Sequence, residues 1–110
     1  MQLLAAVSGA GHQTISVPPQ ADPVFARVPF LVDDKPACIA RATEARVELA
    51  DFYATPVHPL TGAALREVKY EPGSCPNAEW MSQRVVSLPI NHHMKGATLE
   101  RTTAFLQTLN

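Results

Sequence analysis

With 110 residues, the chain can form one domain that buries roughly two-thirds of its unfolded surface, which excludes a second core. Nine basic residues nearly balance ten acidic ones, and the formal net charge of −1 excludes the basic surface that would gather nucleic acid or an anionic membrane. Ten prolines exclude a helical bundle and favour short, interrupted elements, so the composition predicts an α+β fold.

The N-terminal part predicts a short helix and then an extended connection. Residues 1–8 are mostly apolar, and the glycines that follow end a helix too short to persist without packing. Residues 9–26 hold three prolines, so they allow at most an edge strand at 14–17. Alternating residues at 27–32 predict the first strand of the sheet, which Pro29 restricts to an edge or a bulge.

Residues 33–61 predict a helix, a strand and an ordered loop. An aspartate before a proline is typical of a capped first turn, so we expect a helix at 36–45. Alternation predicts a strand at 47–49. Two prolines exclude helix and strand from 54–61, and an ordered loop of this kind often carries function.

The stretch 73–89 holds the only tryptophan between two proline-bounded ends. Pro76 suits a first turn capped by one of the two residues before it. Trp80 and Met81 each have a partner four positions later, so one face of a helix at 76–86 would lie on the core. We therefore expect Trp80 to be buried as the main apolar anchor.

Two more helices complete the predicted fold. Residues 62–68 predict a weak helix, and a final helix near 97–109 is expected to be capped by Thr98 and to bury leucines on one face. The prediction is a single α+β domain with a small, mainly antiparallel sheet. About three helices, at 36–45, 76–86 and 97–109, are expected to cover one face of that sheet.

The cysteines and the apolar segments indicate a compartment. Cys38 and Cys75 lie far apart and lack the CxxC spacing of a zinc site, which predicts two reduced thiols. The apolar run at 3–7 lacks a basic flank and is shorter than the apolar region of a signal peptide. No segment approaches the ~20 apolar residues of a membrane span. The sequence therefore predicts a soluble, cytoplasmic protein with no membrane or nucleic-acid partner.

Four histidines invite a search for a metal or a ligand. His92 and His93 are adjacent and project differently, and no Cys, Asp or Glu accompanies them at ligand spacing, so we expect no metal site. His58 lies between two prolines and is better placed to present a rigid imidazole to a ligand, although an ordinary surface histidine is the simpler interpretation.

A nucleophile pair of Cys75 with His58 or His92 is the one catalytic arrangement that the residue types allow. Cys75 sits at the start of a predicted helix, where a thiol is activated, but the required contact with an imidazole is not visible in the sequence. A lone cysteine with scattered histidines is a weak pattern. No catalytic residue is therefore assigned.

Three motifs in order carry a family resemblance: VELADFYATPVHPL at 47–60, GSCPNAE at 73–79 and VVSLP at 85–89. Together they resemble the C-terminal small domain of the DegT/DnrJ/EryC1/StrS aminotransferases, pyridoxal-phosphate enzymes that aminate keto sugars attached to nucleotides. The resemblance covers roughly residues 25–109. It implies a small-domain core at 25–110, preceded at 1–24 by the end of an interdomain helix and a connection.

The resemblance also implies what this sequence lacks. The family's catalytic lysine, phosphate-binding residues and pyridine partner lie in a large domain, so pyridoxal phosphate is expected only if that domain is supplied in trans. Lys95 does not replace them, because no anion cup lies near it. The family's Pro-x-His loop lies near the sugar-nucleotide cleft, which implies that His58 is a substrate-side contact. Family glycines correspond to Arg46 and Ala50, where a positive φ would be strained.

The expected function is that of a detached or truncated aminotransferase small domain, non-catalytic alone, acting as an oligomerising or ligand-binding module. Residues 1–8, Phe25, Phe52 and Tyr53 are expected to expose an apolar face. Such a face predicts a homo-oligomer, most simply a dimer, or a large-domain partner.

Two alternatives stay open. One is an independent small enzyme or binding protein that uses the loop around His58 together with His92 and His93. The other is a fragment carried on a mobile gene cassette, with no settled role. The sequence alone does not decide whether the chain is an enzyme.

Overall fold

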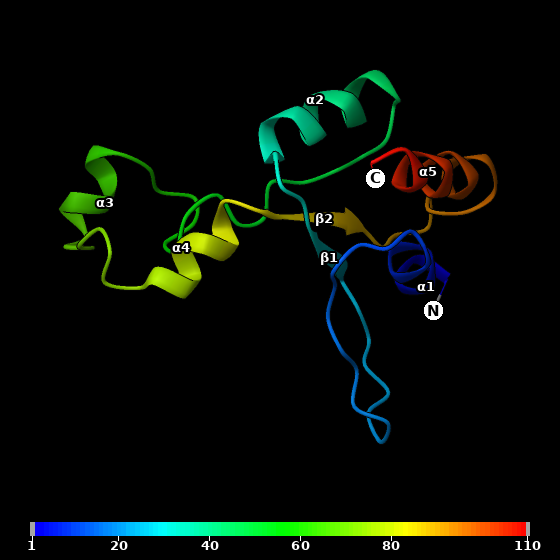
Figure 1. Cartoon of the computed structure of the whole chain (residues 1–110), viewed down its shortest axis with the longest axis horizontal. Helices are drawn as coiled ribbons and strands as arrows, with labels where there is room; N and C mark the ends of the chain where they lie inside the picture. The colour runs from blue at the N-terminus through cyan, green and yellow to red at the C-terminus, as the bar shows by residue number, and fades with distance from the viewer. Residues whose placement is uncertain (1, 110) are drawn as a thin grey trace.

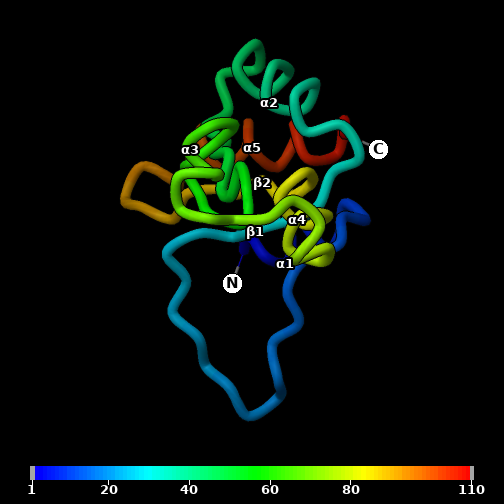
Figure 2. The backbone as a smooth tube through the Cα atoms, turned by 90° about the vertical axis from the view of Figure 1, so that its left-hand side faces the viewer, coloured from blue at the N-terminus to red at the C-terminus, as the bar shows by residue number. Residues whose placement is uncertain are grey.

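The computed structural model describes residues 2–109. Along the chain its elements are α1 (Gln2–Gly9), β1 (Arg27–Leu31), α2 (Lys35–Glu44), α3 (Ala63–Glu67), α4 (Pro76–Ser82), β2 (Val85–Pro89) and α5 (Gly96–Thr108). A two-stranded antiparallel sheet and five helices in these residues confirm the predicted α+β class, with more helices than expected (Figure 1). Between α1 and β1, an extended loop projects away from the other elements in both views (Figures 1 and 2).

The two strands pair antiparallel, with Pro29 of β1 opposite Ser87 of β2. Single antiparallel bridges extend the ladder at both edges, from Thr14 to β1 and from Ala50 to β2. Pro29 has no backbone N–H to donate to a neighbouring strand. Its carbonyl oxygen accepts a hydrogen bond from Thr14 Oγ1 at 2.5 Å. The strand predicted at 47–49 is wrong, because none of these residues pairs with the sheet and only the next residue, Ala50, forms a bridge.

One face of the sheet carries the core. Alternate residues of both strands point to this face and are almost fully buried: Val28, Phe30, Val86 and Leu88. Three helices complete the same cluster: Leu3 and Val7 from α1, Cys38 and Ala42 from α2, and Phe105 and Leu106 from α5. The helices predicted near 36–45 and 97–109 are therefore confirmed as core helices. The third core helix is α1, in place of the one predicted at 76–86.

The helix predicted at 76–86 is too long, and its tryptophan is not buried. α4 has only seven residues, and β2 follows it with all five positions buried. Two β-branched valines open β2, and a short apolar run buried on both faces suits a strand. The spacing of Met81 and Val85 imitates a helical face, which overextends the prediction. Trp80 is 47% exposed and lies on the surface against Arg84, whose guanidinium carbon is 4.5 Å from the ring centroid.

The helix ends follow the predicted chemistry in part. Asp34 Oδ1 accepts from the Ala37 N–H at 3.1 Å, which confirms an aspartate cap on α2. α5 begins at Gly96 with Lys95 in the cap position, so the prediction of Thr98 as the cap is wrong. Among the helices of residues 2–109, none combines the length and apolar composition that crossing a membrane requires.

Arg46 occupies a left-handed position at the end of α2, with a φ of +57°. Its N–H donates to the Thr43 carbonyl and the Val47 N–H donates to the Ala42 carbonyl, which is the bond pair of a Schellman turn. Glycine suits this position because it has no Cβ, whereas another residue is strained by about 1–2 kcal/mol. The strain expected at Arg46 is therefore present. Ala50, by contrast, has no positive φ.

Substitutions at Leu106 and Trp80 test where the core lies. Leu106 is fully buried, so Leu106→Ala should lower the free energy of unfolding by about 2–5 kcal/mol. Trp80→Ala removes a half-exposed ring and should lower it by about 1 kcal/mol or less. Urea denaturation followed by far-ultraviolet circular dichroism measures both values. Equal losses in the two variants would mean that α4 anchors the core.

Candidate functional site

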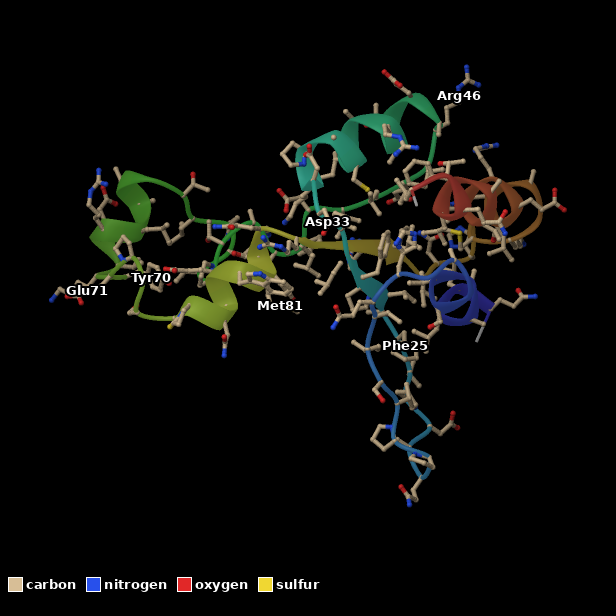
Figure 3. All side chains as sticks on the ribbon, viewed as in Figure 1. Phe25, Asp33, Arg46, Tyr70, Glu71 and Met81 are labelled. Carbon is tan, nitrogen blue, oxygen red and sulfur yellow. The ribbon has the colours of Figure 1, made fainter. Side chains whose placement is uncertain are left out.

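On the second face of the sheet, the loop that follows Ala50 and α4 lie beside residues of the two strands. Between them lies an open, mainly apolar hollow of about 710 Å³. Its lining includes Pro29 and Val85 from the strands, Tyr53, Pro56 and His58 from the loop, and Met81 from α4. Figure 3 shows Met81 on the side of α4 that faces the strands. We call this surface the His58 hollow.

A buried lysine holds the loop to α2. Lys35, the first residue of α2, is 6% exposed, and its Nζ donates to Asp51 Oδ1 at 2.5 Å and to the Tyr53 carbonyl at 3.2 Å. Asp51 keeps 46% of its side chain exposed to water. An ammonium removed from water needs a counter-charge, so this pair fixes the start of the loop against a core helix.

His58 is held in one orientation by its own loop. Nδ1 accepts from the Ala54 N–H at 2.9 Å, and the ring centroid lies 5.0 Å from that of Phe52 and 5.4 Å from that of Tyr53. A backbone N–H can only donate, so Nδ1 carries no proton and the neutral imidazole has its proton on Nε2. Thr55 Oγ1 closes the loop by donating a hydrogen bond to the Leu60 carbonyl at 2.7 Å. His58 therefore offers one N–H donor from a fixed support.

A hydrogen-bonded acid supports the α4 wall of the hollow. Glu79 Oε1 accepts from the Tyr70 hydroxyl at 2.6 Å and from the Gly73 N–H at 2.7 Å. These two donors, the tyrosine first, hold the pKa of Glu79 below its usual range. The hydrogen bond to Glu79 is also the main reason why the pKa of Tyr70 is raised. An ionised Glu79 thus ties the turn before α4 to the helix that carries Met81.

The other predicted candidates lie apart from His58. His92 and His93 are both exposed, with ring centroids 3.8 Å apart, and neither lines the His58 hollow. Cys75, one of the two predicted cap residues, is exposed at the N-cap of α4, and no hydrogen bond within residues 2–109 joins it to His58 or His92. Burial raises the pKa of the other thiol, Cys38, which packs in the core. In the described part of the chain, no three His, Cys, Asp or Glu side chains are grouped as metal ligands would be.

Sequence reasoning assigns no role to Arg27 and Ser87, which lie on the same face as the His58 hollow. The guanidinium carbon of Arg27 is 4.5 Å from the centroid of the Phe52 ring, and Ser87 is 2% exposed. Alternation along the predicted first strand already places Arg27 opposite the core residues. Ser87 gives no such signal, because in the prediction it lies just after the helix at 76–86 and not in a strand.

Comparison of the sequence with protein families shows where the chain belongs. Residues 1–107 match the DegT/DnrJ/EryC1/StrS aminotransferase family. The chain belongs to this family. Searches of curated proteins and of solved structures gave no significant match. The family match confirms the resemblance, and it includes the N-terminal residues in which α1 lies.

Relatives in the DegT/DnrJ/EryC1/StrS family use pyridoxal phosphate, and the three lysines of this chain do not fit that cofactor. Lys95 is exposed at the N-cap of α5, and Lys69 is exposed just after α3. Lys35 is buried, and its ammonium is bound to Asp51 and to the Tyr53 carbonyl. An aldimine lysine needs a free, desolvated amine beside a phosphate cup. Residues 2–109 offer no such amine.

Substitutions in the Lys35–Asp51 pair test how the loop is held. Asp51→Asn leaves a buried ammonium without its counter-charge, whereas Lys35→Met leaves a carboxylate that water reaches. Asp51→Asn should therefore lower the free energy of unfolding by about 2–3 kcal/mol, and Lys35→Met by about half as much. Urea denaturation gives both values, with the exposed Lys69→Met as control. If Lys35→Met lowered the free energy of unfolding more than Asp51→Asn, the argument that the buried ammonium depends on its counter-charge would be wrong.

Proposed function

We propose that this chain acts as a detached small domain of a sugar-nucleotide aminotransferase, non-catalytic on its own, that supplies one wall of a substrate cleft. The observation that carries the proposal is the fixed imidazole of His58, whose Nε2–H remains available as a donor beside an open apolar hollow. Such a donor suits the hydroxyl and diphosphate oxygens of a sugar nucleotide. The family's Pro-x-His loop supports the same role for His58.

The hollow is open to solvent, which favours a cover supplied by another chain. A large-domain partner in trans would hold pyridoxal phosphate and the catalytic lysine, which the described lysines of this chain do not replace. Tyr53 and Met81 expose apolar surface around the hollow, where such a partner would close. Free thiols at Cys38 and Cys75 support a cytoplasmic location.

Titration with dTDP-glucose tests the role of His58. The wild-type protein should bind it with an affinity on the order of millimolar, and the changes in the ¹H–¹⁵N NMR spectrum should centre on residues 52–60. His58→Asn keeps an acceptor for the Ala54 N–H and removes the Nε2 donor. Its affinity should therefore be lower by about tenfold, as expected for one lost hydrogen bond to a charged group.

His92→Asn is the matched control for this titration. It removes an exposed imidazole that does not line the hollow, so its affinity should equal that of the wild type. If His58→Asn also binds like the wild type, His58 is not a substrate contact. Spectral changes confined to α5 would place the nucleotide away from the proposed cleft.

We also propose that, when no large-domain partner covers it, the exposed apolar surface makes the chain a homodimer. Tyr53, Trp80 and Met81 are 59%, 47% and 43% exposed, and Phe25 and Phe52 are partly buried. Apolar surface of this kind commonly meets another protein surface. The expectation that residues 1–8 also contribute is wrong for the apolar face of α1, because that face is buried in the core. Residue 1 itself lies outside the described residues.

Sedimentation velocity tests the proposed dimer. At a concentration on the order of tens of micromolar, the wild-type protein should sediment as a dimer. Met81→Lys places a charge on the exposed apolar surface and should shift the protein to monomer without changing its far-ultraviolet circular dichroism. A wild-type monomer at this concentration would contradict the proposal.

A further inference from the structure

A second hollow, of about 340 Å³, lies beside the His58 hollow on the same face of the sheet. Its lining includes Phe25 and Arg27 at the start of β1, Phe52 and Tyr53 from the loop, and Val85 and Ser87 from β2. Figure 3 shows Phe25 just before β1. Tyr53 and Val85 line both hollows. We call this second surface the Arg27 hollow.

The register of the strands brings two polar side chains to this hollow. Ser87 lies opposite Pro29, and Arg27 precedes Pro29 by two residues on the same face. Diagonal neighbours of this kind are about 7–8 Å apart, a distance that an arginine side chain can span. The juxtaposition of Arg27 and Ser87 thus follows from strand pairing and not from their places in the sequence.

Both polar groups have buried atoms without a protein partner. Within residues 2–109, Arg27 Nη1 and Ser87 Oγ are shielded from solvent and form no hydrogen bond. Ser87 is 2% exposed, and its backbone N–H and carbonyl both bond to Ala50, at 3.0 and 2.9 Å. These two bonds hold the backbone of Ser87 in the sheet. A buried polar group without a partner is unfavourable, and a ligand that pairs with both groups relieves this.

Arg27 also has no counter-charge in the described residues. The one ion pair within residues 2–109 joins Lys35 to Asp51. The guanidinium of Arg27 stacks on Phe52, which fixes the plane of the group. Stacking uses the face of a guanidinium and leaves the N–H donors on its edge for a planar anion.

We propose that the Arg27 hollow binds a small monocarboxylate with a flat apolar body. The carboxylate accepts from the edge of Arg27 and from the Ser87 hydroxyl, and the apolar body contacts Phe25 and Tyr53. One guanidinium matches one negative charge, and the apolar walls supply no second cation for a phosphate dianion. The proposal does not depend on His58 or on the proposed aminotransferase role.

Three probes of similar shape test the proposal on the full chain, followed by ¹H–¹⁵N NMR. Benzoate carries the monocarboxylate, benzamide replaces it with a neutral amide, and phenyl phosphate replaces it with a dianion. Benzoate should bind at least about tenfold more tightly than benzamide, because only benzoate forms a charge-assisted pair. Equal affinities for these two would overturn the proposal. Tighter binding of phenyl phosphate would overturn the choice of a monocarboxylate.

Variants locate the bound carboxylate. Arg27→Gln should weaken benzoate binding by about tenfold or more. Arg84→Gln is the matched control and should bind normally, because Arg84 also stacks 4.5 Å from a ring centroid, that of Trp80, and does not line the hollow. An Arg27→Gln variant that binds like Arg84→Gln would overturn the proposal.

Ser87→Ala provides a test that does not require Arg27→Gln to fold. It should weaken benzoate binding by about fivefold, because the carboxylate loses the hydrogen bond donated by the Ser87 hydroxyl. Its melting temperature should equal or exceed that of the wild type, since the substitution removes a buried hydroxyl that has no partner. Unchanged benzoate affinity in Ser87→Ala, or a lower melting temperature without benzoate, would overturn the proposed arrangement.

Discussion

The pairing of β1 with β2 decides which side chains reach the core and which reach the candidate site. Side chains alternate along a strand, so a shift of one residue would exchange the two sets. In the observed register Val28 faces the core, whereas Arg27 and Ser87 face the loop and its hollows. Ala50 bonds to Ser87 in both directions and fixes the outer edge of β2. The core and the site are thus two faces of the same hydrogen-bonded ladder.

The buried ammonium of Lys35 fixes the position of the loop relative to the strands. Lys35 begins a helix that packs in the core, and its bonds to Asp51 and to the Tyr53 carbonyl hold the loop beside the strands. From there His58 needs only the Ala54 N–H and its aromatic neighbours to be oriented. The position of His58 therefore depends on the packing of α2, although α2 takes no part in the hydrogen bond that orients the imidazole.

Local chemistry predicts part of this fold, and long-range pairing decides the rest. The cap of α2 and the strand at 27–32 depend on neighbours in sequence, so residue patterns are sufficient for them. The run that begins at Val85 is different, because its spacing from Met81 also fits a helix and only β1 makes it a strand. The same ambiguity places Trp80 in the predicted core, although the ring lies on the surface.

Sequence patterns likewise predict one part of the candidate site and miss another part. His58 can be selected from its flanking prolines, because its own loop orients it, whereas Arg27 and Ser87 meet only through the sheet. Burial of Ser87 without a partner is unfavourable, and the apolar packing on the opposite face of the sheet offsets it. The apolar core and the polar groups that we propose bind a ligand therefore lie on opposite faces of one sheet. A substitution on the site face can change binding while the core that fixes its geometry stays intact.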